Sequence, residues 1–228
     1  RYRVEVRLLI VDVDHTLLDW LRAWAVTYRR LLADVTALTG VAPATLLDEL
    51  GALHRRRGIP EVADPLTRLP AMAQWHGEDP HRVARLGEVW HAAVDAGDAA
   101  LTTYPGVAEL LREADAAGTA IVACSETAPH IVERRLRRLG LDGYLDALAV
   151  ARTEGAPTRL RRIETGADKP DAAVLLHTCE AMAVLPRHTT CVGDHLHKDV
   201  LMAQTAGVHD VWAKYGTARD PADLALPE

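Results

Sequence analysis

Residues 7–16 read RLLIVDVDHT, a short apolar run that ends in two acidic residues, Asp12 and Asp14. Continuous runs of Leu, Ile and Val are typical of strands that are buried on both faces of a parallel sheet. The abrupt change to charged residues indicates that the strand ends there and continues into a loop. The sequence therefore predicts two carboxylates at the carboxyl end of a buried strand.

Comparable runs recur along the chain, at Thr119–Cys124 (TAIVAC), His188–Val192 (HTTCV) and Asp210–Ala213 (DVWA). Helical periodicity separates them, at Val107–Ala117, Pro129–Leu139 and Asp171–Ala183. Strands that alternate with helices are joined by right-handed crossovers into a parallel sheet covered on both faces. The predicted fold class is α/β, with a Rossmann-like core of three layers.

The segment from Leu18 to Ala100 does not continue the alternation of strands and helices, because it has helical periodicity and no convincing strand. One long helix is expected from Trp20 to Gly40 and a second from Ala44 to Arg56. A third is expected to begin at Asp79-Pro80, with Asp as its N-cap and Pro at its first position. We therefore expect an α/β core of residues 1–17 and 101–228 and an all-helical insert of residues 18–100. The polar, Arg-rich stretch Arg152–Asp168 is expected to be an extended loop.

The composition excludes some classes of partner. The 228 residues carry a formal net charge of -6, which gives no basic field to attract nucleic acid or anionic lipid. No apolar run approaches the roughly 18–20 residues that span a bilayer, and no secretory signal segment is evident. Three cysteines without a CxxC pair argue against a disulfide framework. We expect a cytoplasmic protein with no nucleic-acid or membrane partner.

Polar residues follow the apolar runs at positions that a parallel sheet brings to one edge. They are Asp12, Asp14, Ser125, Asp194 and Asp199, and Lys169 lies just before a predicted helix. Carboxylates repel one another at close range, so such a cluster needs a cation. Oxygen ligands suit magnesium, and Lys169 offers a second positive charge.

These residues resemble the motifs of the haloacid dehalogenase-like hydrolases, and in particular of phosphatases with a helical, C1-type cap. Asp12–Thr16 (DVDHT) looks like the first motif, DxDxT, and Ser125 like the second-motif hydroxyl. Lys169-Pro170 looks like the third motif, and Gly193–Asp199 like the fourth, GDxxxxD. The resemblance extends from Leu8 to about Tyr215. It implies the strand order 5-4-1-2-3 and a cap inserted after the first motif.

The resemblance also implies roles for the site residues. Asp12 would be the nucleophile that forms an aspartyl-phosphate, and Asp14 would be the general acid and base. Magnesium would bind carboxylate oxygens of Asp12 and Asp194 and the backbone carbonyl of Asp14. Ser125 would bind a phosphate oxygen, and Lys169 would neutralise charge. Asp199 would bind the metal through water or hold Lys169. Thr16 and Glu126 would support the site.

Some residues depart from the family pattern or leave alternatives open. His15 replaces the commonest residue, Gly, and can restrict or contact the leaving group. Glu126 replaces a frequent Asn and adds negative charge near the phosphate, unless it turns away or meets a cation. Arg55 and Arg56 in the insert either grip a second anionic group or form a solvated helix end. His195 and His197 suggest either a zinc site or solvated loop histidines.

The sequence thus predicts a magnesium-dependent phosphomonoester hydrolase that acts on a small phosphorylated metabolite. A dehalogenase is disfavoured, because a halide leaves without an acid or a metal. Two alternatives remain: a phosphomutase or phosphotransferase of the same fold, and a non-catalytic regulatory module that binds a phosphate ligand. The chain could be a monomer or a homodimer.

Overall fold

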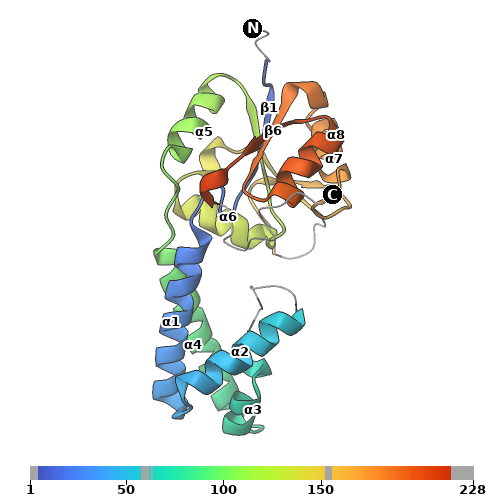
Figure 1. Ribbon diagram of the computed structural model, residues 1–228. Helices are drawn as coiled ribbons and strands as arrows, with labels where there is room; N and C mark the ends of the chain where they lie inside the picture. The colour runs from blue at the N-terminus through green and yellow to red at the C-terminus, as the bar shows by residue number, and fades with distance from the viewer. Residues whose placement is uncertain (1–4, 58–61, 63, 152–155, 217–228) are drawn as a thin grey trace. The chain divides into compact units, whose positions relative to one another are not determined.

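The computed structural model describes residues 5–57, 62, 64–151 and 156–216. The chain divides into two compact units (Figure 1). The first contains the described residues up to Trp20 together with those from Leu101 onward. The second runs from Leu21 to Ala100. Asp12, Asp14, Ser125, Lys169, Asp194 and Asp199 all belong to the first unit, whereas Arg55 and Arg56 belong to the second.

The first unit is built on a parallel sheet, which has six strands within the described residues. The strands are β1 (Leu8–Asp12), β2 (Ala120–Cys124), β3 (Ala147–Val150), β4 (Arg161–Glu164), β5 (Thr189–Gly193) and β6 (His209–Trp212). Their order in the sheet is β4-β3-β2-β1-β5-β6. The predicted α/β class is confirmed. The predicted order 5-4-1-2-3 corresponds to β6-β5-β1-β2-β3, so the sheet differs from it only by the added edge strand β4.

The expectation of an extended loop over Arg152–Asp168 was wrong at β4, which pairs with β3 in parallel register, Ala147 opposite Arg161. Of the four β4 side chains only Ile163 is buried, while the charged neighbours are exposed or half-buried. Charged side chains on an edge strand discourage pairing with other chains. This polar composition conceals the strand in the sequence.

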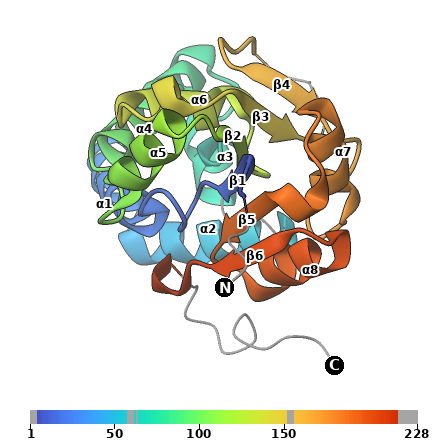
Figure 2. The ribbon, with the colours of Figure 1, turned by 90° about the horizontal axis from the view of Figure 1, so that it is seen from above.

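Helices cover both faces of the sheet, with α5 and α6 on one side and α7 and α8 on the other (Figure 2). Their bounds are α5 (Val107–Ala116), α6 (Pro129–Arg138), α7 (Ala173–Ala181) and α8 (Met202–Ala206). Shorter turns are η2 (Asp142–Tyr144), η3 (Pro186–His188), the π-helical η4 (Leu196–Leu201) and η5 (Lys214–Gly216). Leu8, Ile10 and Leu175 are fully buried in the core between the sheet and the helices. Burial of such a side chain contributes roughly 1.5–3 kcal/mol to the stability of the fold. The packed core thereby holds in place the strand ends that carry the site.

The regular elements described in the second unit are all helices. They are α1 (Trp20–Thr39), whose first residue belongs to the first unit, α2 (Pro43–Arg57), η1 (Leu66–Arg68), α3 (Pro70–His76) and α4 (Pro80–Ala99). Asp79 caps α4 by accepting a hydrogen bond from the His81 amide, as the Asp79-Pro80 pair indicates. Leu31, Leu50 and Leu86 lie in its apolar core. None of the described helices is long and apolar enough to cross a membrane.

The two segments that lead into and out of the second unit lie side by side on the first. The Asp19 amide donates to the Thr102 carbonyl at 3.0 Å, and the Tyr104 amide donates to the Leu17 carbonyl at 3.2 Å. The insertion therefore begins and ends at one place, directly after the loop that follows β1.

Candidate active site

Asp12 is the last residue of β1, and its carboxylate is held by the loop that follows. The Thr16 hydroxyl donates to Asp12 Oδ2 at 3.0 Å. The amides of Leu17 and Leu18 donate to the Val13 carbonyl at 2.9 and 3.2 Å, which folds the loop back onto the strand end. One carboxylate oxygen of Asp12 is thus oriented by its own loop.

Lys169 bridges two carboxylates in the interior. Its Nζ donates to Asp12 Oδ1 and to Asp199 Oδ1, both at 2.7 Å, and its side chain is only 6% exposed. Burial opposes the lysine charge, but Asp12 and Asp199 together raise the pKa of Lys169 well above its ordinary value. The ammonium group is therefore a fixed positive charge between these two residues.

Asp194 brings a further carboxylate to the same place. Carboxylate oxygens of Asp12, Asp194 and Asp199 all lie within 4.8 Å of one another. Burial, with Asp12 and Asp199 adding to it, raises the pKa of Asp194 to about 8. Burial also raises the pKa of Asp12 to about 6, against the opposing effect of Lys169. One lysine does not neutralise three carboxylates, and an all-oxygen donor set of this kind fits a magnesium ion.

Asp199 is fixed by η4, the π-helical turn that follows β5. Its Oδ2 accepts a hydrogen bond from the His195 amide at 3.0 Å, while Oδ1 accepts from Lys169. The side chain packs directly on Gly193, where a Cβ would lie 2.2 Å from the Asp199 Cγ. Glycine is required at this position so that the carboxylate can reach the lysine.

Gly193→Ala is therefore expected to lower the free energy of unfolding by about 1–3 kcal/mol, the usual cost of overpacking. The added methyl group must push Asp199 away from both of its donors. Urea denaturation measures the effect, with Gly143→Ala as the control because a Cβ there meets nothing within 4 Å. Equal unfolding midpoints for the two variants would contradict the packing described.

Asp14 has both carboxylate oxygens engaged by residues that follow β2. Thr127 Oγ1 donates to Oδ2 at 3.1 Å, and Arg135 Nη1 donates to Oδ1 at 3.2 Å. The Arg135 side chain is 9% exposed and that of Asp14 is 22% exposed. Neither Thr127 nor Arg135 was predicted as a partner of Asp14. The available signal was Arg135 itself, which occupies a position on the apolar face of α6 with Val132 and Leu136.

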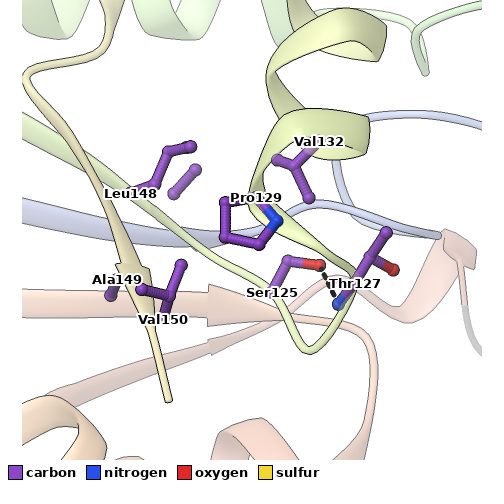
Figure 3. Close-up of a pocket in the computed structure, with 8 residues that line it drawn as sticks. Ser125, Thr127, Pro129, Val132, Leu148, Ala149 and Val150 are labelled. Atoms are coloured by element: carbon purple, nitrogen blue, oxygen red, sulfur yellow. Dashed lines mark hydrogen bonds between the residues drawn. The ribbon is translucent and has the colours of Figure 1, made fainter. Parts of the chain in front are cut away.

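Ser125 lies in the loop between β2 and α6, where its Oγ accepts a hydrogen bond from the Thr127 amide at 3.1 Å (Figure 3). It forms part of the lining of a small pocket that is otherwise mainly apolar, with Pro129 and Val132 among its walls. The cap position of α6 is Ala128, without a side-chain hydrogen bond, so neither Ser125 nor Thr127 caps this helix.

Glu126 meets a cation, which is one of the two conditions under which its charge would not oppose a phosphate. Its Oε2 lies 2.5 Å from Lys198 Nζ, and both side chains are about two-fifths exposed, at 43% and 40%. His195 Nδ1 accepts hydrogen bonds from the amides of His197 and Lys198 at 3.2 and 3.3 Å. That ring nitrogen therefore caps η4.

His15 adopts a left-handed backbone conformation with φ of 63°, a region that glycine occupies most readily. Its ring stacks edge-on against Trp20 with centroids 5.7 Å apart, and burial lowers its pKa. Its carbonyl group packs on Gly216, and the Tyr215 hydroxyl donates to the Thr16 carbonyl at 2.9 Å. The loop of the first motif is thus held by η5 near the end of the described chain.

Arg55 and Arg56 lie in the last turn of α2 in the second unit, and both are exposed. The neighbouring His54 is hydrogen-bonded through Nε2 to the Tyr28 hydroxyl at 2.9 Å. The structure therefore brings together Asp12, Asp194, Asp199 and Lys169, with Asp14 on the adjoining loop.

Comparison with known proteins identifies the family. The profile of haloacid dehalogenase-like hydrolases matches residues 6–207. The chain belongs to the haloacid dehalogenase-like hydrolases. The match spans both units and includes the six predicted core site residues, Asp12, Asp14, Ser125, Lys169, Asp194 and Asp199.

Proteins whose names indicate different reactions are similar to this chain. The phosphoserine phosphatase of Thermus thermophilus is 27% identical over 238 residues, covering 92% of this chain and 90% of that protein. The HAD-hydrolase YfnB of Bacillus subtilis, in a structure bound to magnesium, has a TM-score of 0.61 with 22% identity, covering 91% and 88% of the chains. The 2-haloacid dehalogenase of Pseudomonas syringae has a TM-score of 0.64 with 20% identity, covering 94% and 90%. Because phosphate and halide chemistries share this fold, the reaction must be argued from the site.

Proposed function

We propose that this chain is a magnesium-dependent phosphomonoester hydrolase that acts on a small phosphorylated metabolite through an aspartyl-phosphate on Asp12. The proposal rests on the different surroundings of the Asp12 and Asp14 carboxylates. Lys169 binds Asp12 within the carboxylate cluster, whereas Asp14 is held on the adjoining loop by Thr127 and Arg135. A halide leaves without a proton, so a second oriented carboxyl group favours an ester substrate.

In the first step, Asp12 attacks phosphorus and the bond between phosphorus and the ester oxygen breaks. The positive charge of Lys169 partly neutralises the negative charge of the Asp12 carboxylate. The pKa of Asp12 is about 6, so this carboxylate is largely ionised at neutral pH. Asp14, in its protonated form, gives a proton to the leaving oxygen. Ser125 donates its hydroxyl hydrogen to a phosphoryl oxygen, because its oxygen already accepts from the Thr127 amide.

In the second step, Asp14 takes a proton from a water molecule as that water attacks the phosphorus of the aspartyl-phosphate. The bond between Asp12 and phosphorus breaks, which restores the Asp12 carboxylate and releases inorganic phosphate. The covalent intermediate divides one difficult displacement into two easier ones. Positioning and charge neutralisation provide most of the acceleration in phosphoryl transfer.

The carboxylates of Asp12 and Asp194 and the backbone carbonyl of Asp14 would hold magnesium, which when bound supplies positive charge to the phosphoryl oxygens. Asp199 would act mainly by holding Lys169, given their 2.7 Å contact. The helical unit would act as the cap that selects the substrate, with Arg55 and Arg56 as candidates for a second anionic group.

Stabilisation by magnesium is expected to increase as the pH rises from about 5 to about 8. In the metal-free protein the pKa values of Asp12 and Asp194 are raised to about 6 and about 8, so the folded state binds more protons than the unfolded state does. Ionisation of these groups therefore lowers stability as the pH rises. Magnesium offsets the repulsion between the ionised carboxylates, so its stabilising effect grows as they ionise. Melting temperatures with and without magnesium at the two pH values measure the effect.

Asp194→Asn is the control for this experiment, because it should remove most of the dependence on pH. A magnesium shift that is constant over the range, or larger at the acidic end, would rule out the proposed ligands.

The function is tested by measuring phosphate release from nucleotides, sugar phosphates, cofactor phosphates, O-phosphoserine and p-nitrophenyl phosphate, with magnesium and with a chelator. Magnesium-dependent turnover of at least one ester supports the proposal, and an inert protein across the panel contradicts it. Conversion between hexose phosphate isomers without net phosphate release would indicate a phosphomutase. Binding of phosphate esters without turnover would indicate a regulatory module.

A further inference from the structure

The segment that follows β2 supplies two hydrogen-bond donors to a single carboxylate. Thr127 binds Asp14 Oδ2 at 3.1 Å and Arg135 binds Asp14 Oδ1 at 3.2 Å. The two donors approach different oxygens, so together they resist rotation of the carboxylate about its terminal bond. A single donor would leave that rotation far less restricted, because this torsion is broad and roughly two-fold in carboxylate side chains.

Arg135 is well placed to keep this orientation. It lies within α6 beside the buried side chains of Val132 and Leu136, and the whole residue is only 8% exposed. On the same helix, Glu133 Oε1 accepts hydrogen bonds from the amides of Arg159 and Leu160 at 2.6 and 2.7 Å. The helix is therefore anchored two residues before Arg135. A buried guanidinium also interacts strongly with a carboxylate.

We propose that Arg135 and Thr127 are positioning residues that fix the Asp14 carboxylate for proton transfer to the leaving oxygen, an inference that rests on the function proposed above. Each of the two contacts uses one acceptor site of its oxygen, and a carboxylate oxygen has two such sites. Proton transfer requires the carboxyl oxygen within hydrogen-bond reach of the leaving oxygen, and small displacements are costly. Neither Arg135 nor Thr127 needs to touch the substrate.

The test compares two leaving groups. An alkyl phosphate needs a proton on its leaving oxygen, whereas p-nitrophenolate leaves as a stable anion. Thr127→Val and Arg135→Met are expected to lower kcat/KM for O-phosphoserine, or for the alkyl ester hydrolysed fastest in the panel, by roughly 10²-fold. The loss for p-nitrophenyl phosphate should be under about 10-fold. Thr127→Ser and Arg135→Lys should restore most of the loss that is specific to the alkyl ester.

Arg138→Met is the matched control, since Arg138 is exposed at the end of the same helix. If Arg135→Met does not fold, Thr127→Val decides the question, because valine has nearly the shape of threonine and lacks only the hydroxyl. Equal losses on both substrates, or no loss, would overturn the positioning role while leaving the phosphatase proposal intact. Wild-type protein without phosphatase activity would instead overturn the proposed function.

Discussion

Asp12→Asn is expected to lower kcat for p-nitrophenyl phosphate by on the order of 10⁴-fold or more, because it removes the nucleophile. The amide has the shape of the carboxylate but is a poor nucleophile toward phosphorus. Phosphate release under saturating magnesium measures the loss. Asp115→Asn, at an exposed position of α5, is the matched control and should retain full activity.

The same variant should remain folded, which separates loss of chemistry from loss of structure. Lys169 keeps its 2.7 Å contact with Asp199, and one negative charge leaves a crowded cluster. The melting temperature without metal should therefore be close to that of the wild type. An Asp12→Asn protein that is folded and hydrolyses the ester at more than about a tenth of the wild-type rate would exclude Asp12 as the nucleophile.

Lys169→Met is expected to lower the free energy of unfolding at neutral pH by about 3–5 kcal/mol, the usual cost of removing one partner from a buried ion pair. Asp12 and Asp199 would each lose a hydrogen bond of 2.7 Å and would face one another without a positive charge between them. Activity should fall on the order of 10²–10³-fold, because a charge that stabilises the transition state is lost. Urea denaturation and phosphate release measure the two effects.

The destabilisation should be smaller at about pH 5, below the pKa of about 6 of Asp12, because a protonated Asp12 no longer repels Asp199. Lys214→Met, which removes an exposed lysine, should change neither property appreciably. A Lys169→Met protein as stable as the wild type at neutral pH would show that the bridge contributes nothing to the fold.

The sequence predicted the centre of the site because its residues stand at the ends of strands. Asp12 ends β1, and Asp194 directly follows β5, its neighbour in the sheet, so parallel pairing brings them together. The apolar runs of these strands are clear. Lys169 comes from a connection and not from a strand end, and it was predicted from its place just before a helix together with the family resemblance. Its contacts with Asp12 and Asp199 span 157 and 30 residues of sequence.

Other features depended on tertiary context that local patterns do not carry. Strands β3 and β4 have only four residues each, which gives a weak pattern in the sequence. The residues of β4 are mostly charged because this strand lies at the edge of the sheet. Thr127 and Arg135 reach Asp14 across more than a hundred residues, at separations of 113 and 121. An arginine on the apolar face of a helix was the only local sign that such a contact existed.

The most direct test of the account is the detection of a phosphoryl group on Asp12. In an Asp14→Asn protein the leaving group of p-nitrophenyl phosphate still departs unaided, but the base that activates water is absent. Mixing this variant with substrate and magnesium, followed by acid quenching and mass spectrometry, should show a mass increase of one phosphoryl group, located on the peptide that contains Asp12. An active wild type whose quenched Asp14→Asn variant carries no phosphoryl group, or carries it on another residue, would contradict the account.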